Sequence, residues 1–183
     1  MMNVITGAAR GRKLLSPPNE ITRPTAGVVK EAIFNIIQFE IEGAKVLDLF
    51  AGSGQLGIEA LSRGAASCTF VETSKEACDI IEKNLKATGF FELARIKNML
   101  AEVFLKRAGM LFDIAFLDPP YAEGMVNKVM PFVVRLMAEN GVVVCEASRE
   151  DALNERFGDY KLIKEYRYGK KKLSLFRIDL EEI

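Results

Sequence analysis

A glycine-rich turn between a strand pattern and a helix pattern is the feature that most restricts how this chain folds. The run KVLDLF at 45–50 is short and almost entirely apolar, which is typical of a parallel strand buried on both faces. The segment GQLGIEALSRG at 54–64 follows it with helical spacing of its apolar residues. Gly52, Gly54 and Gly57 fit the pattern G-x-G-x-x-G, which between a strand and a helix predicts a site for a nucleotide-like cofactor.

The alternation of strand and helix patterns continues along the chain. Further strands are expected at 67–72, 94–98, 112–118, 142–148, 160–168 and 171–179, and further helices at 74–89, 100–108 and 124–139. Strands that alternate with helices form right-handed crossover units around a mostly parallel sheet. We therefore predict an α/β fold, a Rossmann-like doubly wound sheet of seven mostly parallel strands, closed by an antiparallel C-terminal hairpin.

A small extension precedes this pattern. The stretch NVITGAARGRKL at 3–14 reads as two short strands around glycine-bearing turns, and 24–40 reads as a helix. We predict an N-terminal hairpin-and-helix extension over residues 1–40 and a main domain over residues 41–183.

Composition excludes several kinds of chemistry. The 183 residues include no histidine, so a Ser-His-Asp triad, a Cys-His pair and histidine metal ligands are all excluded. The three cysteines lie far apart, which indicates neither a zinc site nor a disulfide framework, and we expect no bound metal. No apolar run is long enough for a membrane span and no secretory signal is visible, so we expect a cytoplasmic protein.

Formal charge is balanced overall, with 25 basic and 25 acidic residues, but both ends of the chain are basic. Basic residues outnumber acidic ones in 1–30 and in 160–177. Two interpretations stay open at this point: solvated faces, or surfaces that contact nucleic-acid phosphates.

Two acids define the kind of cofactor. Asp48 lies at the mouth of the glycine loop, where a carboxylate disfavours a pyrophosphate and favours a ligand with a positive group. Glu72 ends the second strand and can accept hydrogen bonds from ribose hydroxyls, which serves either kind of cofactor. The chain is also too short for the second domain of a dehydrogenase. These features favour S-adenosylmethionine, which carries an ammonium and a sulfonium.

The sequence DPPY at 118–121 follows the fourth strand of the main domain. Prolines have no N–H, and they hold Asp118 in an extended conformation, so this turn is a rigid group of hydrogen-bond acceptors. Such acceptors can hold the two hydrogens of an exocyclic amine and direct its lone pair at a methyl group, while Tyr121 stacks on the base. We predict that Asp118, Pro119, Pro120 and Tyr121 form the catalytic site.

Together, DLFAGSGQLGIEALSRG and FLDPPY resemble the class I S-adenosylmethionine-dependent methyltransferases that modify exocyclic amines. ITGAARGRKL, TRPT and VKEAIFNII resemble the RsmD family, which methylates N2 of a guanine in 16S ribosomal RNA, and the resemblance runs from residue 3 to about 178. It implies a small-subunit RNA partner and a set of site residues in this chain. The implied cofactor-binding residues are Asp48, Phe50, Gly52, Gly54, Glu72 and Asn98, and the implied RNA-binding residues are Arg10, Arg12, Lys13, Arg23 and Thr25.

One position departs from the family pattern. Leu100 stands where the family has an acid or amide before alanine that contacts the adenine of the cofactor, and Asn98 or Glu102 are candidates to replace it. Two other functions also remain as alternatives: an adenine-N6 DNA methyltransferase, which would use the same acceptors, and a ribosome-assembly protein that binds RNA without catalysis.

Overall fold

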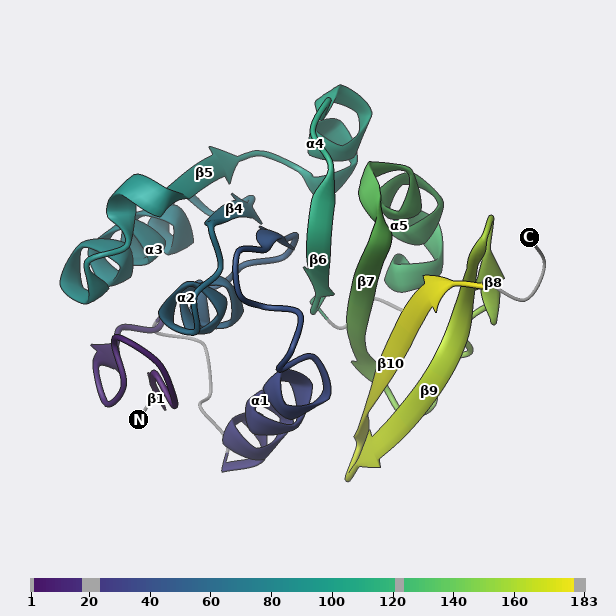
Figure 1. Ribbon diagram of the computed structural model, residues 1–183, viewed down its shortest axis with the longest axis horizontal. Coiled ribbons are helices and arrows are strands. Elements are labelled where there is room, and N and C mark those ends of the chain that lie inside the picture. Colours follow the sequence, from purple (N-terminus) through teal and green to yellow (C-terminus); the bar gives the residue numbers. More distant parts are fainter. Residues whose placement is uncertain (1, 18–23, 121–123, 180–183) are drawn as a thin grey trace.

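Eight strands form one mixed sheet in the part of the chain that the computed structural model describes, residues 2–17, 24–120 and 124–179 (Figure 1). The strand order is β5-β4-β3-β6-β7-β10-β9-β8, in which β3 to β7 are parallel and the last three strands are antiparallel. The strands of this sheet are β3 (Lys45–Asp48), β4 (Ser67–Glu72), β5 (Ala94–Asn98), β6 (Phe112–Leu117), β7 (Met137–Ser148), β8 (Arg156–Phe157), β9 (Tyr160–Tyr168) and β10 (Lys171–Ile178).

Helices cover both faces of the sheet, so the predicted doubly wound α/β fold is confirmed. The described sheet has eight strands and not the predicted seven, because the two-residue strand β8 was not expected. Figure 1 shows α1 and α2 on one side of the strands and α4 and α5 on the other. The helices are α1 (Pro24–Ile36), α2 (Gln55–Ser62), α3 (Lys75–Thr88), α4 (Ala101–Arg107) and α5 (Met125–Val133), with short 3-10 turns η1 (Phe91–Leu93) and η2 (Val134–Leu136). Ser74 caps α3 by accepting the N–H of Ala77 at 3.2 Å, as expected of a serine before a helix.

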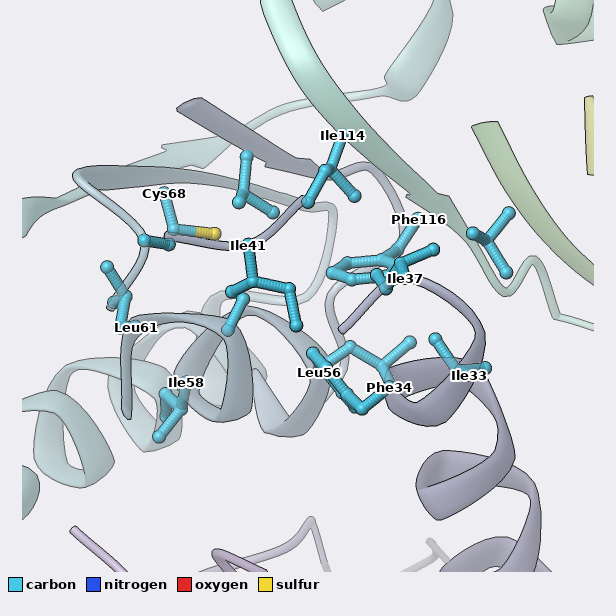
Figure 2. Close-up of a cluster of buried hydrophobic side chains, with 14 of the residues drawn as sticks. Ile33, Phe34, Ile37, Ile41, Leu56, Ile58, Leu61, Cys68, Ile114 and Phe116 are labelled. Atoms are coloured by element: carbon cyan, nitrogen blue, oxygen red, sulfur yellow. The ribbon is translucent and has the colours of Figure 1, made fainter. Parts of the chain in front are cut away.

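The core lies in two layers, one on each face of the sheet. Ile33 and Phe34 of α1, Leu56 of α2 and Phe116 of β6 belong to one of them, and the rings of Phe34 and Phe116 lie 5.6 Å apart (Figure 2). Residues of α4 and α5 pack against the opposite face. All three cysteines are buried and unbridged. Among the described residues, no helix has the length and apolar character to cross a bilayer.

The predicted helix at 124–139 is wrong in its last part. Helix α5 ends at Val133, and the chain enters β7 at Met137, which pairs with Phe112 of β6. Pro131 lies inside α5 and has no N–H for the helical ladder, which weakens the helix near its end. The apolar residues after Pro131 are spaced as in a helix, but pairing with β6 gives this segment the conformation of a strand from Met137 on.

The N-terminal extension contains the two short strands and the helix that the sequence predicts, although the helix ends at Ile36 and not at residue 40. Strands β1 (Met2–Asn3) and β2 (Lys13–Leu14) pair antiparallel, and we call residues 2–15 the arm. Apolar residues of the arm and α1 belong to the same core layer as α2 and β6. The extension and the sheet therefore share one hydrophobic core.

The carboxylate of Glu59 on α2 joins the arm to the rest of the protein. Its oxygens accept the N–H groups of Ile5 and Thr6 at 2.8 and 2.9 Å, and they pair with Lys30 at 3.2 Å and Arg63 at 3.0 Å. Glu59 is completely buried and Lys30 is 4% exposed. Burial lowers the pKa of Lys30, and the charge of Glu59 opposes this change.

Asn84 of α3 forms a second link between the arm and the main domain. Its side chain accepts the N–H of Leu15 at 2.8 Å and donates to the carbonyl of Leu15 at 2.9 Å. The same amide group donates to the carbonyl of Ser53 in the glycine loop at 3.0 Å. The end of the arm and the glycine loop are thus held by one buried side chain.

We expect Glu59→Ala to lower the free energy of unfolding by ~3–5 kcal/mol, because it leaves the buried Lys30 ammonium without its counter-ion and two backbone donors without their acceptor. Urea denaturation followed by circular dichroism measures this change. The matched control is Glu82→Ala, which removes an exposed ion pair with Lys86 and should cost less than ~1 kcal/mol. Equal losses in the two variants would contradict the anchoring role of Glu59.

Candidate active site

Three carboxylates meet at the carboxyl ends of neighbouring strands. Asp48 ends β3, Glu72 ends β4, and Asp118 follows β6. Because the strand order is β4-β3-β6, Asp48 lies between the other two. In doubly wound sheets this edge is where ligands bind. The predicted cofactor acids and the predicted catalytic acid therefore lie at one site, as the sequence indicated.

The glycine loop after β3 is held by backbone bonds and by Glu72. The N–H of Ala51 donates to the carbonyl of Val71 at 3.0 Å, and the N–H of Gly52 donates to the Glu72 carboxylate at 2.9 Å. Gly52 and Gly54 have φ angles of 54° and 78°, in the left-handed region that favours glycine. This conformation turns the chain sharply from β3 into α2.

Gly57 allows α2 to lie directly against β4. A Cβ atom at this position would lie 2.3 Å from the ring of Phe70 and 2.6 Å from the sulfur of Cys68. The N–H of Gly57 donates to the Asp48 carboxylate at 3.0 Å, so the same residue also fixes Asp48. Gly57 therefore serves the packing of helix on strand, which is the role of the third glycine in this motif.

Burial raises the pKa of Asp48 to about 7, although the bond from Gly57 opposes the rise and the charges of Asp118 and Glu72 add to it. The Asp48 side chain is nearly inaccessible to solvent. Burial also raises the pKa of Asp118, and the ammonium of Lys171 opposes that rise. A cation bound at this edge would relieve the repulsion among the three carboxylates, so the site fits a positively charged ligand.

Glu72 is oriented by the turn that follows it. One carboxylate oxygen accepts the N–H of Ser74 at 2.9 Å and the hydroxyl of Thr73 at 3.3 Å, in addition to the bond from Gly52 to the other oxygen. A carboxylate offers about four acceptor positions, so these bonds position Glu72 and still allow it to accept from a ligand hydroxyl.

Asn98, a predicted cofactor residue, supports this same turn. Its amide group donates to the carbonyls of Glu72 and Thr73 at 3.0 and 2.9 Å. Leu100 is 58% exposed and precedes α4, and Glu102 pairs with Lys128 at 2.9 Å. Asn98 thus acts on the position of Glu72, and the residue that contacts the cofactor adenine stays a prediction.

The remaining predicted cofactor and RNA residues lie at different places. Phe50 packs at the edge of the core layer of α4 and α5. Arg10, Arg12 and Lys13 are exposed on the arm. Arg23 and Tyr121 lie outside the described residues, and the side chain of Thr25 does as well.

Pro119 and Pro120 line a pocket beside Asp118. Glu146 on β7 lines the same pocket, and its carboxylate bonds to the ammonium of Lys171 on β10. Sequence reasoning missed both of these residues. A signal was available for Glu146, because an acid within the apolar run VVVCEAS of a buried strand is unusual.

Several known proteins resemble this chain over most of its length. A family model described as "Conserved hypothetical protein 95" matches residues 2–177. The "Ribosomal RNA small subunit methyltransferase D" of Escherichia coli K12 is 40% identical over 146 residues, covering 80% of this chain and 71% of the relative. YlbH of Bacillus subtilis 168 is 38% identical over 181 residues, covering 96% and 98%. The solved structure of yhhF from Escherichia coli has a TM-score of 0.85 and 33% identity, covering 97% and 98%.

The raised pKa of Asp48 predicts that binding of S-adenosylmethionine depends on pH. Below pH 7 the free protein holds a proton on Asp48, and a cationic ligand favours the ionised form, so binding must release that proton. We expect the Kd to rise up to about tenfold for each unit that the pH falls below 7, and to level off above it.

Calorimetry in two buffers of different ionisation enthalpy, between pH 5.5 and 7.5, measures both the Kd and the proton released. The variant Asp48→Asn should bind more weakly and lose the pH dependence. The control Asp79→Asn makes the same change in an exposed residue that pairs with Lys75, and it should behave like the unchanged protein. The same pH dependence in Asp48→Asn would exclude Asp48 as its source.

Proposed function

The chain belongs to the RsmD family of ribosomal RNA methyltransferases, and from that premise we propose that it methylates the N2 amine of a guanine in 16S ribosomal RNA. One observation carries the proposal. Asp118 and two prolines form a turn rich in acceptors at the end of β6, directly beside the strand that leads into the glycine loop. The substrate within this proposal is RNA of the small ribosomal subunit.

The methyl donor is S-adenosylmethionine, whose sulfonium makes its methyl group electrophilic. In the proposed arrangement, Asp48 and the glycine loop hold the methionine part, and Glu72 accepts the ribose hydroxyls. The fit rests on the charge of the site: a cluster of three carboxylates, of which Asp48 is buried, lies beside a loop without cations near its glycines and suits a cationic ligand.

The turn at Asp118 prepares the amine for attack. The lone pair of an exocyclic amine is delocalised into the base and is a poor nucleophile. Asp118 and the Pro119 carbonyl accept the two amine hydrogens, direct the lone pair toward the methyl group and stabilise the positive charge that develops on nitrogen. Asp118 takes up the released proton after transfer or passes it to water. Stacking of the base on Tyr121 remains part of the proposal.

We expect Asp118→Asn to reduce kcat by ~10²-fold or more, because a transition-state acceptor becomes a group that also donates. The Kd of S-adenosylmethionine should change little. Single-turnover methylation and calorimetry measure the two quantities. The control is Asp113→Asn. Asp113 lies at the other end of β6, far from the turn, and its side chain accepts the N–H of Lys45 at 2.8 Å. Full activity in Asp118→Asn would remove this residue from the mechanism.

Transfer of a radiolabelled methyl group tests the function itself. The acceptors are unmodified small ribosomal subunits, protein-free 16S RNA and duplex DNA, each digested to nucleosides afterwards. N2-methylguanosine from subunits or RNA supports the proposal. N6-methyladenine in DNA would replace the substrate and keep the acceptor chemistry, and RNA binding without any transfer would identify a non-catalytic binder.

The exposed cations of the arm are the proposed contacts to RNA phosphates. Glu59 and Asn84 fix the arm against α2 and α3, so Arg10 and Arg12 are presented from a rigid base. We expect Arg10→Ala with Arg12→Ala to weaken RNA binding and to reduce the dependence of log Kd on log salt concentration by about 1 for each lost contact.

Filter binding at several salt concentrations measures this slope. The matched control is Lys106→Ala with Arg107→Ala, which removes two exposed cations from the last turn of α4. An unchanged slope in the arm variant, or an equal loss in the control, would contradict a specific role for the arm.

A further inference from the structure

The pocket beside Asp118 is lined by Glu146, whose carboxylate pairs with Lys171 and has no part in the proposed methyl transfer. Glu146 is 8% exposed, and its Oε1 accepts a hydrogen bond from the Lys171 ammonium. The Lys171 side chain is 26% exposed, so the pair is partly desolvated. Such pairs add little net stability, since desolvation offsets their attraction. The position of Glu146 in the pocket points instead to recognition of a ligand.

Sheet register brings this pair to the proposed target amine. Leu117 of β6 lies opposite Cys145 of β7, so the next residues along the two parallel strands are Asp118 and Glu146. On the other side of β7, Leu173 of β10 lies opposite Glu146. Side chains two residues apart share a face of a strand, so Lys171 lies on the face of Leu173 and Glu146.

Three neighbouring strands therefore present three polar groups in a fixed order. Asp118 comes from β6, Glu146 from β7 and Lys171 from β10, and these strands are adjacent in that order. The first two groups are carboxylates, which accept hydrogen bonds, and the third is an ammonium, which donates them. The Lys171 charge acts on both acids, because it also opposes the raised pKa of Asp118.

The pairing edge of guanine has a matching order of groups. Its N2 amine and N1–H are donors and its O6 is an acceptor, whereas adenine has an acceptor at N1 and an amine at C6. Enzymes that modify a base take it out of the stack and read it by hydrogen bonds to this edge. We propose that Glu146 accepts the N1–H of the target guanine and that Lys171 donates to its O6.

This assignment rests on the proposed function, and it adds two residues that select the base. While Oε1 of Glu146 keeps its bond to Lys171, Oε2 is the oxygen that receives the N1–H. Adenine in the same position would place its N1 lone pair against the carboxylate and its amine against the ammonium. Both contacts are repulsive, so the pair selects against adenine as well as for guanine.

Base analogues test this reading. After the methylated position has been mapped, small subunits are reconstituted around RNA that carries guanine or 2,6-diaminopurine at that position. The analogue keeps the N2 amine but has an acceptor at N1 and an amine in place of O6. We expect kcat/KM with guanine to exceed that with the analogue by ~10–10²-fold. In Glu146→Gln and Lys171→Met, this ratio should fall to about a tenth of its value or less.

The control Lys172→Met removes a similar ion pair, with Glu165 at 3.0 Å, from the adjacent residue on the opposite face of β10. Its ratio should equal that of the unchanged protein. A ratio that stays unchanged in both Glu146→Gln and Lys171→Met would overturn the inference, even if activity with the two bases fell equally. Absence of N2-methylguanosine with the unchanged protein would instead overturn the proposed function, and the base-reading roles with it.

Discussion

The close approach of α2 to β4 at Gly57 is the contact on which the rest of the site depends. No side chain larger than hydrogen fits between the helix and Phe70. The same residue donates its N–H to Asp48, so the start of α2, the glycine loop and the end of β3 have one fixed arrangement. Two residues farther along the helix, Glu59 pairs with Lys30 and Arg63 and accepts two N–H groups of the arm. Helix α2 thus connects the cofactor loop to the proposed RNA-binding surface.

Because this chain has no histidine, the electrostatics of its proposed active site depend on the burial of Asp48 and on the carboxylates beside it. Asp48, Glu72 and Asp118 lie on adjacent strands, and burial and mutual repulsion make ionisation of Asp48 costly near neutral pH. This cost is the reason that the site favours a cationic ligand. Lys171 supplies the opposite charge on the far side of Asp118 and limits the repulsion there. The charge along this edge of the sheet therefore changes from acidic at the proposed cofactor site to mixed at the proposed base site.

Short sequence patterns correctly predicted the features of the fold that depend on neighbouring residues in the chain. Strands such as β3 and β6, buried on both faces, are short apolar runs, and the glycines between β3 and α2 identify the turn, so the fold and the three carboxylates were predictable. The end of α5 was not, because pairing of Met137 with Phe112 overrides a helical spacing. The meeting of Glu146 with Lys171 depends on strand pairing, which no local pattern records. Glu59 would be expected on a solvated helix face, and only the docking of the arm explains its burial.

The bond from Asn84 to Leu15 has a consequence for synthesis of the chain. These two residues are 69 positions apart in the sequence. Glu59 is likewise 54 positions from Ile5 and 53 from Thr6, the two residues of the arm that donate to it. The arm is made before α2 and α3, so it leaves the ribosome before its acceptors on these helices exist. A hairpin of two-residue strands is too small to be stable alone. The arm therefore becomes ordered only after α3 has been made, and until then its cations lie on an unfolded segment.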